Sequence, residues 1–122
     1  MTGSSDLPRP RQGDIWLTAF GAARLGEPGK TRPALIVSAN GLVGSSAFDL
    51  VIVAPISASL TPTQSRPAIS ATPSTGLEAD SVVVVRAVRS ISPTRLLKRL
   101  GMADAATMAG VQEILVALLG LP

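Results

Sequence analysis

Hydrophobic residues follow two different spacings along the chain, and the change between them separates a strand region from a helical region. Residues 13–20 alternate between apolar and polar side chains, which is the period of a half-buried β-strand. Residues 33–39, 49–57 and 81–91 are nearly continuous apolar runs rich in β-branched side chains, and residues 66–71 alternate weakly. The chain up to residue 91 is therefore predicted to form about five strands.

Beyond residue 91 the apolar residues recur at helical spacing, and two helices are predicted there. Ser92 and Pro93 resemble a helix start, with an N-cap hydroxyl before a proline at the first helical position, and Gly101 resembles a helix end. Asp104 is the predicted N-cap of a second helix, whose apolar stripe continues to Gly120.

Strands followed by segregated helices indicate the α+β class, so we expect a small, strongly bent sheet or barrel covered by the C-terminal helix. Residues 1–11 combine serine, proline and charge and are expected to form a flexible tail, whereas residues 12–122 form a single domain. We find no signal peptide and no run of roughly 18 apolar residues. No membrane association is therefore expected, and the predicted location is the cytoplasm.

The composition narrows the chemistry that the protein can perform. The 122 residues include no Cys and no His, which excludes a disulfide scaffold, a thiolate or imidazole metal site and a Ser-His-Asp triad. The eight carboxylates are scattered, so neither a metal nor another cofactor is expected. The formal charge is +3 and nine of the 11 cations are arginine, which favours a phosphate-bearing partner. One Trp and two Phe are too few for an aromatic platform that stacks bases.

Polar residues beside the buried strands are the candidate functional residues. Arg32 stands between a glycine-rich loop and a strand, Ser57 ends a strand, and Glu27 lies in the loop before Arg32. Each also has a simpler structural interpretation, which is the more frequent one for any single residue of its kind. These are a solvated arginine, a hydroxyl bonded to the backbone of the following turn, and a solvated loop charge.

The remaining basic residues are assigned by the predicted elements. Arg86 and Arg89 are three positions apart in the last predicted strand, which puts them on opposite faces. Arg95, Lys98 and Arg99 fall on the first predicted helix, where basic residues near the C-terminus complement the helix dipole.

Taken together and in order, these segments resemble the MazF/PemK/Kid family of toxin endoribonucleases. The resemblance implies a small, SH3-like, strongly bent antiparallel β-barrel of the CcdB/MazF kind with a C-terminal helix, usually a homodimer. It further implies cleavage of single-stranded RNA without a metal, and neutralisation by a cognate antitoxin that occupies the RNA groove. The matching segments include GDIWLTAF, RPALIVS, VAPIS, GLEADS, RSI and RLLKRLG, which begin at residues 13, 32, 53, 76, 89 and 95.

By this resemblance, Arg32 and Ser57 match the two catalytic positions, and Glu27 matches an acidic residue that assists with RNA or proton transfer. RNA contacts are expected from five residues of the neighbouring segments, namely Lys30, Thr31, Gln64, Arg66 and Arg86. The chain departs from the family at Arg86, where an acidic residue is frequent, and it lacks the histidine that some members carry.

The implied reaction needs no metal-activated water, because RNA carries its own nucleophile in the ribose 2′-OH. Attack on the adjacent phosphate gives a 2′,3′-cyclic phosphate and a 5′-OH end. Two other functions remain open at the sequence level. One is a CcdB-like poison of gyrase on the same fold, and the other is a catalytically silent module that binds RNA or a partner protein.

Overall fold

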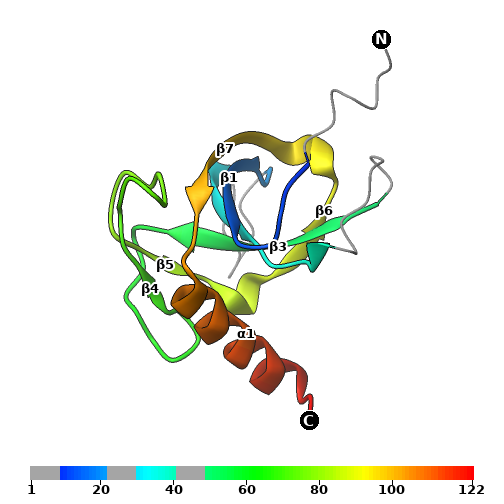
Figure 1. Cartoon of the computed structure of the whole chain (residues 1–122), viewed down its shortest axis with the longest axis vertical. Coiled ribbons are helices and arrows are strands. Elements are labelled where there is room, and N and C mark those ends of the chain that lie inside the picture. Colours follow the sequence, from blue (N-terminus) through cyan, green and yellow to red (C-terminus); the bar gives the residue numbers. More distant parts are fainter. Residues whose placement is uncertain (1–8, 22–29, 41–48) are drawn as a thin grey trace.

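The computed structural model describes residues 9–21, 30–40 and 49–122 (Figure 1). The described chain forms seven strands and one α-helix, with two short 3₁₀ turns between the later strands. In chain order these elements are β1 (Asp14–Ala19), β2 (Thr31–Ile36), β3 (Val51–Ser57), β4 (Ala68–Ile69), β5 (Ser81–Val83), η3 (Val85–Ala87), β6 (Arg89–Ile91), η4 (Pro93–Arg95), β7 (Leu96–Met102) and α1 (Ala105–Leu119).

The strands form one curled antiparallel sheet in the order β4-β5-β3-β2-β1-β7, with β6 paired to β3 outside this path. Strand β3 is the centre of the fold, since β2 pairs along one of its edges while β6 and β5 share the other. Pro55 lies between the stretch that pairs with β6 and the stretch that pairs with β5. A residue without an N–H is tolerated there because the ladder on that edge changes partners. The expected α+β class and strongly bent antiparallel sheet are confirmed.

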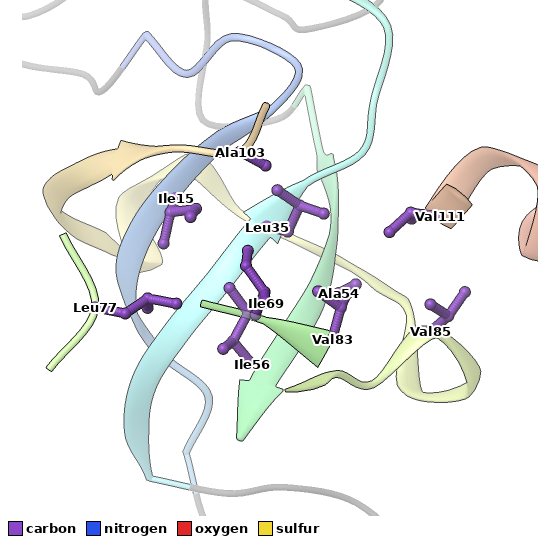
Figure 2. Packing of buried hydrophobic residues seen from close by; sticks show 10 residues of the cluster. All are labelled: Ile15, Leu35, Ala54, Ile56, Ile69, Leu77, Val83, Val85, Ala103 and Val111. Atoms are coloured by element: carbon purple, nitrogen blue, oxygen red, sulfur yellow. The ribbon is translucent and has the colours of Figure 1, made fainter. Parts of the chain in front are cut away.

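The two faces of the curled sheet carry separate hydrophobic clusters, because side chains alternate along each strand. Leu35 on one face packs with Ile15 and Ile56 in the first cluster, which Val111 of α1 joins at one side (Figure 2). Ala34 and its neighbours on the other face pack with the second cluster, in which Phe20 is buried and Trp16 is partly buried. The full first cluster contains Ile15, Leu35, Ala54, Ile56, Ile69, Leu77, Val83, Val85, Ala103 and Val111.

The predicted helix after Ser92 is wrong, because most of that segment is strand β7. Ser92 does cap a turn, its hydroxyl accepting the N–H of Thr94, but the turn is the single 3₁₀ turn η4. The chain then extends along β1, with Lys98 paired to Leu17. Gly101 is a strand residue and not a helix end. A Cβ there would lie 2.2 Å from the carbonyl oxygen of Ser74, so the glycine allows two backbone segments to touch.

The single strand predicted over residues 81–91 is also wrong, since η3 divides it into β5 and β6. Val83 pairs with Ile56 and Arg89 pairs with Val53. The segment from Val83 to Arg89 thus has three residues more than the stretch of β3 that it follows. These extra residues are taken up by the 3₁₀ turn, which places Val85 in the core.

Helix α1 begins and ends as predicted. The Asp104 carboxylate accepts the N–H of Thr107 at 2.8 Å, and Gly120 adopts the left-handed conformation (φ 67°) of a C-terminal cap. Val111 is the buried residue of this helix, and it lies near Val85 at one side of the core cluster (Figure 2). Within the described ranges, no helix has both the length and the apolar character needed to cross a membrane.

Candidate functional site

A cleft of about 460 Å³ opens at the edge of the sheet where β2 begins and β3 ends. Its walls come from the start of β2, the end of β3, the loop before β5 and the middle of β1 and β7. Arg32 lines this cleft and is half-buried. We refer to it as the Arg32 cleft.

The floor of the Arg32 cleft is a row of side chains that crosses the sheet. Pro33 of β2 pairs with Leu17 of β1, which in turn pairs with Lys98 of β7. Paired residues of neighbouring strands present their side chains on the same face, so these three form one row. Ile56 of β3 also lines the cleft, and the floor is therefore apolar with a lysine at its far end.

The two candidate catalytic residues occupy corresponding positions on neighbouring strands. The ladder between β2 and β3 pairs Ala34 with Pro55, and both strands extend beyond this pair, to Thr31 in β2 and to Ser57 in β3. Continued by two residues, this register brings Arg32 opposite Ser57. Side chains alternate along a strand, so both lie on the face opposite to the row that contains Pro33.

The hydroxyl of Ser57 already has partners within the chain. Ser57 is 3% exposed, and its Oγ lies 3.1 Å from the Oγ of Ser59 and accepts the N–H of Ser59 at 3.2 Å. This is the turn-closing role expected for a strand-end hydroxyl. The residue that follows, Ala58, lines the cleft itself.

One wall of the cleft is a loop fixed by close backbone contacts. A Cβ on Gly76 would lie 2.1 Å from the carbonyl oxygen of Leu100, and Gly76 adopts a positive φ of 69°. The hydroxyl of Thr75 donates to the carbonyl of Ser70 at 2.9 Å and accepts the N–H of Thr72 at 3.0 Å. The loop is thereby held against β7, which positions Glu78 at the rim of the cleft.

The predicted RNA-binding residues do not gather at one place. Thr31 lines the Arg32 cleft, and Lys30 precedes it in an exposed position. Gln64 and Arg86 line a second groove, which the loop before β4 forms with α1. Arg66 is in neither groove, and its backbone forms an isolated bridge with Thr63. Glu27 lies outside the described residues.

The basic residues assigned from the predicted elements have other surroundings. Arg86 belongs to η3, where it donates to the Ser65 hydroxyl at 3.3 Å, and not to a regular strand as predicted. Arg89 lies 5.8 Å from the centre of the Phe20 ring. The predicted helix-dipole role of the later residues is wrong, because they lie on η4 and β7.

Arg95 and Arg99 each contact a segment far away in the sequence. Arg95 donates to the carbonyl of Ala19 at 3.1 Å, and Arg99 forms an ion pair with Asp14 at 3.2 Å. Both contacts join the last strand region to β1.

Sequence reasoning missed Lys98 and Glu78 as residues of the cleft. The pattern around Lys98 predicts a helix, and Glu78 lies in a turn region that contributes the segment GLEADS to the resemblance but no predicted site residue. The signal available for Lys98 was its place between leucines in a segment that also fits a strand.

Comparison with known proteins gives the same fold and a family. Residues 11–119 match the model of the family described as the PemK-like, MazF-like toxin of type II toxin-antitoxin system. A relative named endoribonuclease MazF9, from Mycobacterium tuberculosis, is 30% identical over 108 residues, which cover 86% of this chain and 92% of the relative.

Solved structures share the curled sheet. The crystal structure of MazF (form I) from Deinococcus radiodurans has a TM-score of 0.79 at 24% identity and covers 93% of this chain and 99% of its own. An endoribonuclease in complex with its cognate antitoxin, from a mycobacterial species, has a TM-score of 0.70 at 23% identity, covering 93% and 97%. Since the family model spans nearly the whole sequence, this chain belongs to the PemK/MazF family of toxins of type II toxin–antitoxin systems.

Proposed function

We propose that this protein is the toxin of a type II toxin–antitoxin system and cleaves single-stranded RNA in the cytoplasm without a metal ion. The observation that carries the proposal is the position of Arg32. It lines a cleft at the end of the sheet, and the register of β2 and β3 sets it opposite Ser57. Family membership and the named endoribonuclease among its relatives support the reaction class.

In the proposed reaction the RNA supplies its own nucleophile. The 2′-oxygen forms a bond to the adjacent phosphorus while the bond from phosphorus to the 5′-oxygen of the next nucleotide breaks. The products are a 2′,3′-cyclic phosphate and a 5′-OH end. The 2′-OH proton passes to a general base, for which Glu27 is the proposed carboxylate, and the leaving 5′-oxygen takes up a proton from solvent.

Arg32 and Ser57 act on the phosphate in this reaction. The Arg32 guanidinium donates to the nonbridging oxygens and stabilises the charge that grows on them in the transition state. A guanidinium gives up its proton very reluctantly, so the role of Arg32 is electrostatic. The Ser57 hydroxyl orients the phosphate by a hydrogen bond. Lys30 and Thr31 adjoin Arg32 at the start of β2, and we propose that they contact the RNA backbone there.

A homodimer and a cognate antitoxin are the proposed protein partners. Four apolar side chains near the end of α1 are exposed, namely those of Val116, Leu118, Leu119 and Leu121. Clustered apolar surface of this kind is typical of protein interfaces. The mycobacterial relative of this fold that was solved with its cognate antitoxin gives further support.

The decisive experiment incubates the purified protein with single-stranded RNA in excess EDTA and compares Arg32→Ala. We expect cleavage of RNA by the wild-type protein, no cleavage of the matching DNA, and a loss of about 10²-fold or more in the variant. Arg95→Ala, which removes an equal charge outside the cleft, is the control and should cleave normally.

Two results would overturn the proposal. Inhibition of supercoiling without RNA cleavage would indicate a gyrase poison, and RNA binding without cleavage would indicate a silent binding module.

A further inference from the structure

The Arg32 cleft holds more charge than the proposed reaction uses. Besides Arg32, its lining includes the exposed side chains of Lys98 on β7 and Glu78 on the wall loop. Within the described ranges, neither of these two residues forms an ion pair, whereas the neighbouring Arg99 is paired with Asp14. Lys98 and Glu78 are thus available to a ligand in the cleft.

The spacing of the strands separates the two cations. Arg32 lies on β2 and Lys98 lies two strands away, on the far side of β1. Neighbouring strands are about 4.8 Å apart, so the backbones of β2 and β7 are separated by about 10 Å across the floor. The surface between them consists of Pro33 and Leu17, which offer no hydrogen bond to a ligand from their side chains. Arg32 follows Thr31 and precedes Pro33 in β2, so its side chain leaves the opposite face of the strand and only Lys98 belongs to the row of the floor. This arrangement suits a flat, partly apolar group on the floor with an anionic group at its Lys98 end.

Glu78 brings the opposite chemistry to the rim. An ionised carboxylate only accepts hydrogen bonds, and it repels phosphate. Its loop is held by the backbone contact of Gly76 with β7 and by Leu77, which is buried in the core. The backbone that carries Glu78 is therefore fixed beside the cleft, and from the rim the carboxylate can accept N–H groups from a ligand that lies on the floor.

We propose that the Arg32 cleft is a nucleotide subsite that holds one unpaired base on its floor, with Lys98 binding a flanking phosphate and Glu78 accepting hydrogen bonds from the base edge. Guanine is the base that fits, because its Watson–Crick edge presents two adjacent N–H donors to the two carboxylate oxygens. Uracil presents one N–H between two carbonyl oxygens, which the carboxylate repels. This inference rests on the proposed function for its ligand, single-stranded RNA.

The test measures binding, so that it stays separate from cleavage. The probe is a random pool of single-stranded RNA with 2′-fluoro riboses, which lacks the nucleophile. Binding is followed as a function of salt for the wild-type protein, Lys98→Ala, Lys98→Arg and the control Arg95→Ala. The bound pool is sequenced for the wild-type protein, Glu78→Gln and Glu78→Asp.

We expect Lys98→Ala to reduce the slope of log K against log salt by about 0.7, the value for one phosphate contact on a single strand. Lys98→Arg and Arg95→Ala should keep the wild-type slope. The wild-type protein should enrich guanine at one position, and Glu78→Gln should abolish that enrichment while leaving the salt slope unchanged. Glu78→Asp, which keeps the carboxylate, should retain a weaker preference.

Several results would overturn the subsite. A slope for Lys98→Ala equal to the wild-type slope would show that Lys98 binds no phosphate and only lines the cleft. If the wild-type protein enriches no guanine, or if Glu78→Gln enriches it equally, Glu78 does not recognise the base edge. Cleavage of natural RNA is assayed in parallel. If the wild type binds the pool with these signatures but cuts no RNA, the subsite stands and the nuclease proposal fails; if it binds no RNA, both fail.

Discussion

The hydroxyl of Ser57 illustrates how one residue can serve both the fold and the proposed reaction. A hydroxyl has one proton to donate and two lone pairs that accept. The N–H of Ser59 occupies one lone pair, and the Ser59 hydroxyl, 3.1 Å away, is able to occupy the second. In that arrangement the Ser57 proton is left for an acceptor outside the chain, which in the proposed reaction is a phosphate oxygen.

Removal of this proton gives the prediction at the scale of the residue. Ser57→Ala should lower kcat for RNA cleavage by roughly 10- to 100-fold, the loss for a hydrogen bond to a charged group, with little change in KM. Ser57→Thr keeps the hydroxyl and should retain most of the activity. Single-turnover kinetics would measure both, with thermal unfolding as the control for folding. An Ala variant of wild-type kcat would exclude Ser57 from the reaction.

Helix α1 offers a prediction about a single cap and its pH dependence. The hydrogen bonds that Asp104 accepts, first from the backbone N–H of Thr107 and then from its side chain, lower the pKa of the carboxyl from its usual 3.8. A carboxyl whose pKa is lower in the folded state stabilises the fold at neutral pH, and this contribution disappears as the pH falls through the folded-state pKa.

Asp104→Ala should therefore unfold at lower urea concentration than the wild type at pH 7, and the difference should narrow below about pH 3. Urea titrations at the two pH values, followed by circular dichroism, would measure this. Asp104→Ser is the control, since it restores an uncharged cap and should show a smaller difference without the pH dependence. Equal stability of the wild type and the Ala variant at pH 7 would contradict the role of the cap.

Gly76, where the wall loop touches β7, gives a prediction at the scale of the element. A Cβ at Gly76 would overlap the backbone of Leu100, and the positive φ adds strain for any other residue. Gly76→Ala should therefore destabilise the protein by about 2 kcal/mol or more. Gly110→Ala is the matched control, because a Cβ there meets nothing within 4 Å, and in the helix it should stabilise by about 0.5–1 kcal/mol. Equal effects of both changes would contradict the close packing of this loop.

The elements that the sequence predicted well are those that local signals determine. Asp104 and Gly120 bound α1 because a cap depends on a few neighbouring residues. The helix predicted over β7 is wrong because Ser92 and Pro93 begin a 3₁₀ turn with the same local signals that begin an α-helix. The segment that follows is a strand because it pairs with β1, about 80 residues earlier. Lys98 was therefore missed as a cleft residue. The register that sets Arg32 opposite Ser57 likewise depends on pairing between distant segments.

At the scale of the whole molecule, Asp14 joins the beginning of the described chain to its last strand. This side chain is 5% exposed, and its two oxygens accept from the backbone N–H of Arg11 at 2.9 Å, the indole N–H of Trp16 at 3.3 Å and the guanidinium of Arg99 at 3.2 Å. The bond to Arg99 connects residues 85 positions apart. One carboxylate thus closes the turn before β1, fixes the indole and holds β7 on β1.

Loss of this carboxylate should cost more than loss of the ion pair alone. Arg99 is half-exposed, so Arg99→Ala should destabilise by about 0.5 kcal/mol, as for other solvent-exposed pairs. Asp14→Ala also leaves two part-buried N–H donors without their acceptor and should cost about 2 kcal/mol or more. Trp16 is the one tryptophan of the chain, so its fluorescence reports both the unfolding transition and the loss of the indole contact. In Arg99→Ala the Asp14 carboxylate still accepts the N–H groups of Arg11 and Trp16. A double-mutant cycle of Asp14 and Arg99 should therefore assign only a small part of the destabilisation by Asp14→Ala to the ion pair. Equal destabilisation by the two single changes would instead make the ion pair the dominant contact.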